Sequence, residues 1–287
     1  MVKEIKNSDV RKLFPRRDPN SHKGMNGKVM IVGGSIDYYG APVLSALGAL
    51  YGGCDLVYLF VPECNFNVCR SLYPDFIVRS FPGEYLDMKG VSGILDFAPK
   101  CDAILLGPGL GDREETFDAL LKIVKSVNIT TVLDSEAIQV FQKIREVPLP
   151  QKIVITPHHN EFENLTGKDI NISGSLSGKI VLLRTLATDL KINILLKGPH
   201  DLIASEEGEI VMNSTGNAGM TVGGSGDVLS GFVASLIAQG AAPFAACQAA
   251  TYIIGKAGDN LFKQKAYCFS SSDLAFEIPY TVKSVVF

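Results

Sequence analysis

The stretch from Asn213 to Gly231, NSTGNAGMTVGGSGDVLSG, holds six glycines and one acid, Asp227, directly ahead of an apolar pattern at helical spacing. This pattern runs as far as Ile237, and Gly240 marks the expected end of the helix. The first N–H groups of a helix have no partner within it, and the helix dipole is positive at that end, so phosphate binds well there. The sequence therefore predicts an anion-binding loop that leads into a helix.

Three glycines close this loop, Gly223, Gly224 and Gly226, and they can adopt a positive φ that lets a phosphate approach the backbone. Asp227 follows them at the helix start, either as a cap worth about 1 kcal/mol or as a base beside a bound phosphoryl group. Ser225 could cap the helix nearly as well, which favours the second role. We expect Asp227 to be a weak base, because the end of the helix stabilises its anion.

Short strands alternate with helical patterns along most of the chain, and the strands are continuously apolar, which is typical of a parallel sheet covered on both faces. One helical pattern carries Phe117, Leu120, Leu121 and Val124 on a single stripe. We expect one three-layer α/β domain with a mostly parallel central sheet and helices on both faces. Strands are expected at 28–34, 54–62, 75–81, 101–106, 130–135, 152–158 and 192–197, helices at 41–53, 66–73, 113–127, 225–239 and 243–262, a hairpin at 201–213 with its turn at 206–208, and a simple connection at 146–151.

Glycine-rich or polar loops follow five of these strands directly. In an open parallel sheet, ligands bind at the carboxyl ends of the strands, so the five loops should line one edge together. This shared position is a stronger indication of a binding site than any one loop. The loops cover residues 33–35, 107–112, 133–136, 156–161 and 197–201.

Composition excludes several functional classes. The net charge is −3, and 46% of the 287 residues are hydrophobic, so the chain has no basic surplus for nucleic acid and enough apolar residues for a large core. The chain starts without a signal-peptide pattern, and no apolar run approaches the roughly 18 residues of a membrane helix. Six scattered cysteines without metal-like spacing indicate reduced, mostly buried thiols in a cytoplasmic protein. Basic residues cluster early, so residues 1–20 are expected to form a solvated arm.

Common phosphate and nucleophile motifs are missing. The spacing from Gly219 to Gly224 fits a Walker A loop, but Ser225 and Gly226 stand where lysine and a hydroxyl residue belong. No GxSxG elbow occurs. GGSGD, at 223–227, instead resembles the anion-hole signature of ribokinase-like small-molecule kinases.

The wider set of motifs is more specific. SHKGMNGKVMIVGGS, YYGAPVLSALGALYGG, GPGLG, TPHHNEF, LLKGPHD and the opening stretch occur in the order found in the ADP/ATP-dependent NAD(P)H-hydrate dehydratases, over residues 16–260. The resemblance implies a ribokinase-like fold and repair of hydrated NADH and NADPH, called NADHX and NADPHX. It also implies Mg²⁺, ADP or ATP as phosphoryl donor, and a homotetramer. Members often carry an N-terminal epimerase domain; we expect none in residues 1–287, and a separate epimerase acting on the same substrate.

The resemblance assigns roles residue by residue. It implies that Asp227 is the catalytic acid–base residue. Glu161 is the candidate for orienting Mg²⁺, directly or through water, with an exposed acid at a helix start as the alternative interpretation. Substrate contacts are implied for Ala41, Gly109, His158 and Asp227, and nucleotide contacts for Lys197, Gly198, Pro199, His200, Asp201, Gly223, Gly224, Ser225 and Gly226. Ser225 replaces the usual threonine, and His159-Asn160 replaces Pro-Gly.

The implied chemistry is reasonable in itself. Hydroxide leaves C6 of the hydrated ring slowly, whereas phosphorylation of that hydroxyl creates a good leaving group, and elimination then restores the C5=C6 double bond. Phosphoryl transfer requires positioning and charge stabilisation, which a glycine loop at a helix start can supply. Two alternatives share the loop: a ribokinase-like kinase of a vitamin-like alcohol such as a thiazole or pyrimidine, and a silent nucleotide-binding regulator.

Overall fold

The computed structural model describes residues 2–144, 149, 151–167 and 176–287. Within these residues the strands form a ten-stranded sheet in the order β1-β10-β9-β8-β7-β6-β5-β2-β3-β4. All neighbouring strands are parallel except β9, which runs antiparallel to β8 and β10. The strands are β1 Lys3–Glu4, β2 Lys28–Val32, β3 Leu56–Pro62, β4 Phe76–Phe81, β5 Ala103–Leu106, β6 Thr130–Leu133, β7 Ile153–Ile155, β8 Asn193–Leu196, β9 Asp201–Ala204 and β10 Ile210–Asn213.

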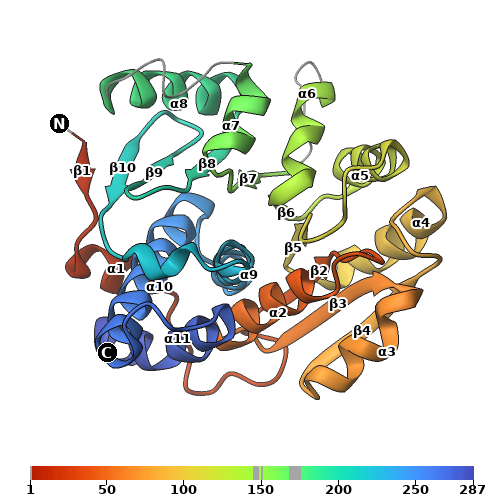
Figure 1. Ribbon diagram of the computed structural model, residues 1–287, viewed down its shortest axis with the longest axis horizontal. Helices are drawn as coiled ribbons and strands as arrows, with labels where there is room; N and C mark the ends of the chain where they lie inside the picture. Colours follow the sequence, from red (N-terminus) through yellow and green to blue (C-terminus); the bar gives the residue numbers. More distant parts are fainter. Residues whose placement is uncertain (1, 145–148, 150, 168–175) are drawn as a thin grey trace.

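Helices cover both faces of this sheet (Figure 1), and the two buried apolar clusters follow the same division. The three-layer α/β arrangement expected from the sequence is therefore confirmed. One face is covered by α1 Asn7–Leu13, α2 Gly40–Tyr51, α3 Glu63–Leu72, α9 Ser225–Ala238, α10 Pro243–Lys265 and α11 Ser271–Val286. The other is covered by α4 Met88–Phe97, α5 Glu114–Ser126, α6 Phe141–Ile144, α7 His159–Thr166 and α8 Leu176–Leu190.

Most expected elements occur where the sequence places them. The hairpin is β9 and β10, joined by a turn in which the N–H of Gly208 donates to the carbonyl of Ser205. In α5, Leu120 and Val124 are fully buried as expected, whereas Phe117 and Leu121 are only partly buried, because the buried side of the helix also includes Thr116, Ala119 and Ile123. The connection expected at 146–151 lies largely outside the described residues.

The N-terminal arm is only partly solvated: most of its charged residues are exposed, but apolar residues between them are buried, so the expectation of a solvated arm was wrong for these. Strand β1 pairs with β10, and Ile5, Val10 and Phe14 are at most 9% exposed within the core. Arg11 donates from Nε to the carbonyl of Val285 in α11. The cluster of basic residues obscured the apolar positions between them, which bury the segment against α10 and α11.

Helices α2 and α9 run parallel in direct backbone contact. A Cβ at Gly48 would overlap the carbonyl oxygen of Val228, and a Cβ at Gly231 would overlap that of Ser45. Glycine is required at both positions because any side chain would separate the helices. The close packing brings the N-terminal ends of α2 and α9 to the same edge of the sheet.

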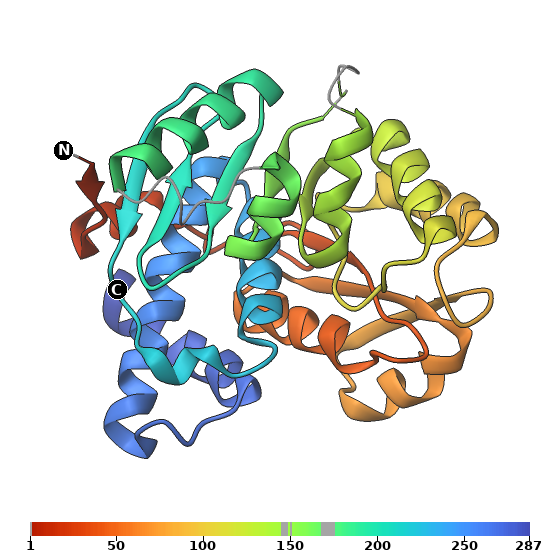
Figure 2. The ribbon, with the colours of Figure 1, turned by 45° about the horizontal axis from the view of Figure 1, so that its top comes forward.

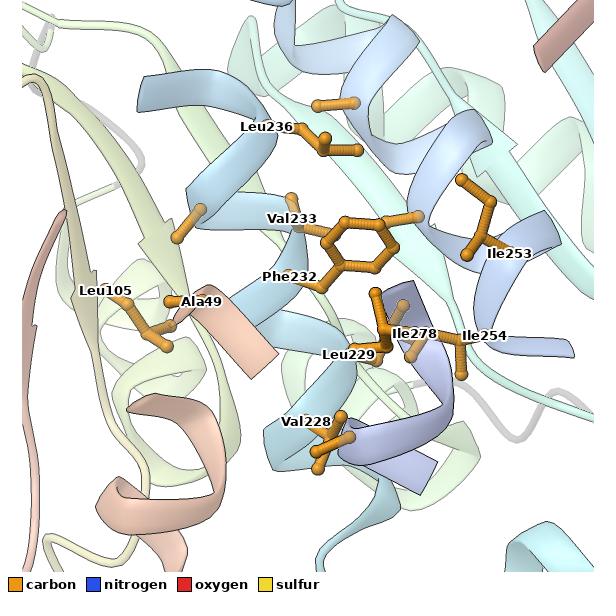
Figure 3. Packing of buried hydrophobic residues seen from close by; sticks show 14 of the residues in the cluster. Ala49, Leu105, Val228, Leu229, Phe232, Val233, Leu236, Ile253, Ile254 and Ile278 are labelled. Atoms are coloured by element: carbon orange, nitrogen blue, oxygen red, sulfur yellow. The ribbon is translucent and has the colours of Figure 1, made fainter. Parts of the chain in front are cut away.

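Phe232 lies at the centre of this layer. Figure 3 shows its ring pointing from α9 toward Ile253 of α10 and Ile278 of α11, while Ala49 of α2 and Leu105 of β5 lie on the other side of α9. Helix α9 is therefore enclosed by apolar contacts along its length, as the eleven buried residues from Val228 to Ala238 indicate. This enclosure holds the start of α9 in a fixed position relative to the sheet.

The six cysteines are free thiols, four of them buried, as the sequence indicated. Cys64 and Cys268 are the exposed pair. In the part of the chain that the structure describes, every helix is too short or too polar to cross a lipid bilayer.

Candidate active site

The five loops that follow strands lie side by side at the carboxyl edge of the sheet, as predicted. Hydrogen bonds continue past the strand ends and link each loop to the next: Gly34 N to Pro108 O at 2.8 Å, Gly107 N to Val32 O at 3.2 Å, Asp134 N to Leu106 O at 3.1 Å, Thr156 N to Leu133 O at 3.1 Å, and Lys197 N to Pro157 O at 2.8 Å. Helix α9 begins beside this edge (Figures 1 and 2). The edge therefore gathers polar groups from separate parts of the chain.

The glycine loop enters α9 through Gly224, whose φ is +93°. Of the three glycines that can adopt a positive φ, only Gly224 does so, and Gly223 and Gly226 do not. No side chain caps the helix: Ser225 donates from Oγ to the carbonyl of Met220 instead, and Asp227 is the third residue of α9. The absence of a side-chain cap leaves this helix end suited to an external anion.

Asp227 is a stronger base than its helix position suggested. Burial raises the pKa of Asp227 to about 8, and the negative charge of Asp134 adds to this effect while Lys197 opposes it. The expectation of a weak base was wrong, because loss of hydration and neighbouring carboxylates outweigh the stabilisation that the helix end gives to the anion. A carboxyl group with this pKa is well matched to proton transfer near neutral pH.

Lys197 lies in the charged centre of the site. Its ammonium Nζ is 2.9 Å from Oδ1 of Asp134, and a Cβ at Gly226 would stand 3.2 Å from the same nitrogen. Burial alone would lower the pKa of Lys197, but the charges of Asp134 and Glu161 more than offset this, and the pKa lies above its usual value. Lys197 therefore remains a cation beside the start of α9.

Asp134 is a site residue that the sequence reasoning did not name. Its loop, LDSE at 133–136, was singled out by its position after a strand, but no role was assigned to Asp134 itself. The side chain is 1% exposed, and it accepts hydrogen bonds from Thr156 Oγ1 at 2.7 Å and from Lys197 Nζ at 2.9 Å. A buried carboxylate requires such partners, because an unpaired charge inside a protein is costly.

Glu161 and His158 form a capping box at the start of α7. The N–H of His158 donates to Oε2 of Glu161 at 2.7 Å, and the N–H of Glu161 donates to Nδ1 of His158 at 3.2 Å. The alternative interpretation of Glu161 as an exposed acid was wrong, since its side chain is 17% exposed and burial raises its pKa. The imidazole of His158 is half exposed and faces solvent at the site, and burial together with Lys197 lowers its pKa.

Ala41 and Gly109 lie together where α2 begins. Gly109 has a φ of +68°, and a Cβ there would stand 3.2 Å from Cβ of Ala41 and 2.8 Å from Cβ of Tyr38. Tyr38 and Tyr39 are both more than half exposed beside this pair, and the sequence analysis did not select them. Substrate contact at Ala41 and Gly109 stays a prediction, but both face the edge that holds Asp134.

The segment from 197 to 201 forms the tight connection between β8 and β9. Asp201 holds it: Oδ1 accepts from the N–H of Gly198 at 3.0 Å, and Oδ2 accepts from Nδ2 of Asn213 at 3.1 Å. Asp201 is thus engaged in shaping the turn, while Pro199 and His200 are exposed. Nucleotide contact along this segment stays a prediction.

The site has the features of one that works with a divalent cation. Among the described residues, no three His, Cys, Asp or Glu side chains gather as a complete set of metal ligands. However, the carboxylates of Asp134, Glu136, Glu161 and Asp227 are close enough to interact electrostatically, and Lys197 opposes this charge at Glu161 and Asp227. Among the described residues, Oε2 of Glu136 is buried without a hydrogen-bond partner. Mg²⁺ is commonly held by one or two carboxylates together with nucleotide phosphates and water, and Glu136 and Glu161 fit that pattern.

A three-layer fold around a mostly parallel sheet, with an anion-suited glycine loop and a partly buried acid at one helix start, defines a ribokinase-like protein. Residues 29–280 match the family described as NAD(P)H-hydrate dehydratase. The chain belongs to this family.

Individual relatives agree with this assignment. The ADP-dependent (S)-NAD(P)H-hydrate dehydratases of Cenarchaeum symbiosum and Nitrosopumilus maritimus are 35% and 37% identical, over 97% and 96% of this chain and 96% and 94% of theirs. The bifunctional NAD(P)H-hydrate repair enzyme Nnr of Methanocaldococcus jannaschii is 37% identical over 95% of this chain, which spans 51% of that protein, about half the length of the bifunctional relatives it matches. The ADP/ATP-dependent NAD(P)H-hydrate dehydratase of Bacillus subtilis, crystallised with ATP/Mg²⁺, superposes with a TM-score of 0.86 at 26% identity over 99% of both chains.

Proposed function

We propose that this protein dehydrates the S form of NADHX and NADPHX back to NADH and NADPH, using ADP or ATP, in metabolite repair. Family membership and the relatives named for this activity support the proposal. The observation that carries it is the placement of Asp227 and Lys197 at the uncapped start of α9. A hydroxyethylthiazole kinase of Pyrococcus horikoshii shares the fold at only 12% identity and a TM-score of 0.63, so a vitamin-alcohol kinase is the weaker candidate.

The first half of the reaction transfers a phosphoryl group to the C6 hydroxyl. The bond between the hydroxyl oxygen and phosphorus forms as the bond to the nucleotide breaks, and the hydroxyl proton passes to the ionised carboxylate of Asp227. The raised pKa of Asp227, about 8, makes that anion a better proton acceptor than an ordinary aspartate. Backbone N–H groups at the start of α9 and the ammonium of Lys197 stabilise the charge on the transferred group.

The second half eliminates phosphate. The C6–O bond breaks as a proton passes from C5 to water, which restores the C5=C6 double bond and releases inorganic phosphate. When bound, Mg²⁺ neutralises the negative charge of the nucleotide phosphates, and we propose that Glu161 orients it directly or through water. Glu136, with its unpartnered oxygen, is a second carboxylate available on the same side.

The same proposal covers the location of the protein, its assembly, the source of its substrate and its phosphoryl donor. We propose that residues 1–287 act as one domain in the cytoplasm, assembled as a homotetramer, and that a separate epimerase supplies the S form of the substrate. ADP is the proposed preferred donor, since the archaeal relatives of similar length are named ADP-dependent.

One experiment separates the three candidate functions. Purified protein is incubated with NADHX, Mg²⁺ and either ADP or ATP, and the absorbance of the reduced nicotinamide is followed together with inorganic phosphate. A dehydratase restores the absorbance and releases phosphate in equal amounts. A kinase of another alcohol leaves NADHX unchanged and accumulates a stable phosphorylated product with its own substrate, and a silent regulator binds nucleotide without any turnover.

A further inference from the structure

We propose that Asp134 is a positioning residue that holds the ammonium of Lys197 against the transferred phosphoryl group at the start of α9, and that Thr156 orients Asp134 for this task. The inference rests on the proposed function and adds a residue outside the set that the family resemblance assigns. Two side chains donate hydrogen bonds to Oδ1 of Asp134: Thr156 Oγ1 at 2.7 Å and Lys197 Nζ at 2.9 Å.

The backbone of Asp134 is fixed more firmly than an ordinary loop residue. Its N–H donates to the carbonyl of Leu106, and a Cβ at Gly107 would overlap its carbonyl oxygen, so β5 and the β6 loop are in direct contact there. The next residue, Ser135, has a φ of +53°, which is uncommon for a residue with a side chain. Such strain persists only where surrounding structure enforces it, and it is frequent at functional sites.

The carboxylate of Asp134 therefore has a fixed position, and it limits the rotamers that the side chain of Lys197 can adopt. Lys197 has a long side chain with many rotamers, and the ion pair selects the one that brings Nζ beside Gly226. Without Asp134, the ammonium would be free to turn toward Glu161, which also attracts it. The distance between Lys197 and the phosphoryl group would then change, and charge stabilisation depends on that distance.

A double-mutant cycle tests whether Asp134 acts through Lys197. Asp134→Asn keeps the size of the side chain and an acceptor for Thr156, and it should lower kcat for NADHX by about 10–10²-fold with less than about threefold change in the KM for nucleotide. Lys197→Met should lower kcat by about 10²–10³-fold. In the Lys197→Met background, Asp134→Asn should cost less than about twofold. Effects that multiply instead would show that Asp134 does not work through Lys197 and would overturn the inference.

A matched control and a second readout separate positioning from stability. Asp55 is a second carboxylate with little exposure, and it lies just before β3 at the amino edge of the sheet, whereas Asp134 follows β6 at the carboxyl edge. Asp55 pairs with Arg17 and accepts hydrogen bonds from the N–H groups of Gly24 and Asn26. Asp55→Asn should lower the melting temperature and leave kcat unchanged. A loss of kcat in Asp55→Asn equal to that in Asp134→Asn would assign the effect to stability and contradict positioning.

The pairing can also be tested without turnover. In ligand-free protein, Asp134→Asn should lower the pKa of Lys197. A fall of one pKa unit raises the fraction of free amine about tenfold. Acetylation of Lys197 by acetic anhydride, followed by mass spectrometry, should therefore become several-fold faster. Unchanged labelling would overturn the inference even if the enzyme is active, whereas faster labelling in a protein that never dehydrates NADHX would retain the pairing and refute the proposed function.

Discussion

Gly231 of α9 packs directly against the carbonyl oxygen of Ser45 in α2, leaving no space for a Cβ. We predict that Gly231→Ala destabilises the protein by about 1–3 kcal/mol, because the added methyl forces the two helices apart within a packed core. Chemical denaturation measures the change. Gly93→Ala is the control, since Gly93 lies in α4 with nothing within 4 Å of its Cβ position. Equal stability of the two variants would contradict the close packing.

Asp227→Asn should produce a folded, more stable and nearly inactive enzyme. Asn cannot accept the hydroxyl proton, and loss of a general base costs about 10²–10⁴-fold in rate. The measurement is NADHX turnover with saturating nucleotide, with ADP binding as the check on folding. A variant that keeps more than about a tenth of wild-type turnover, well outside that range, would remove Asp227 from the chemistry.

The difference in stability between Asp227→Asn and the wild type should depend on pH. The pKa of Asp227 is about 8 in the folded protein against a usual value of 3.8, so the folded state binds the proton more tightly than the unfolded chain does. The stability from this proton is present below about pH 4 and is lost as pH rises toward 8. Asp227→Asn lacks this loss, so its advantage in melting temperature should grow between these pH values. A constant difference would indicate an exposed carboxyl with an ordinary pKa.

The rate should also rise with pH. The plot of kcat/KM against pH reports the free enzyme, and only ionised Asp227 accepts the proton. We therefore expect kcat/KM to increase through a pKa of about 8 and then level off. A rising limb near pH 4 would show that Asp227 keeps an ordinary pKa in the folded protein.

Gly226→Ala should separate stability from activity. Gly226 is in α9 without a positive φ, so alanine fits the helix and should stabilise it by about 0.5–1 kcal/mol. Its Cβ would stand 3.2 Å from Nζ of Lys197 and would displace the ammonium and any phosphate there. Turnover should fall by about 10²-fold. The exposed-helix control Gly93→Ala should gain similar stability with normal turnover, and normal turnover in Gly226→Ala would refute the phosphate site.

Nucleotide binding should raise the melting temperature. A ligand that binds only the folded state adds about 2.7 kcal/mol at 100 times its dissociation constant. ADP or ATP with Mg²⁺ should therefore stabilise the protein, and GTP should have little effect. The control is Mg²⁺ alone; no shift with either adenine nucleotide would contradict the nucleotide site.

The sequence was sufficient to predict the sheet, the layered fold and the edge where the site lies, because continuous apolar strands followed by glycine loops have few other solutions. It was not sufficient for the arm, since Val10 and Phe14 stand in a short segment dominated by charged residues. Their burial depends on α10 and α11, whose positions no local pattern encodes.

At the site, motif order pointed to Asp227 and Lys197 but not to how they interact. The pKa of Asp227 depends on Asp134 and Glu161, which are far from it in sequence and meet it only at the sheet edge. Asp134 lies in the LDSE loop that the sequence singled out, but its role follows only from the 2.9 Å contact with Lys197. A single sequence records residue types, whereas these electrostatic effects require the distances between them.

The docking of the N-terminal segment also constrains how the chain can reach this structure. Lys3 pairs with Val211 in β10, Arg11 reaches Val285, and both chain ends lie on the side of the sheet where β1 and β10 lie (Figure 2). During synthesis the N-terminus emerges first, yet β10 is made much later and Val285 is among the last residues made. The first strand therefore stays unpaired at least until β10 has left the ribosome. Attachment of β1 joins residues far apart in sequence, and pairing of this kind is an intrinsically slow step of folding.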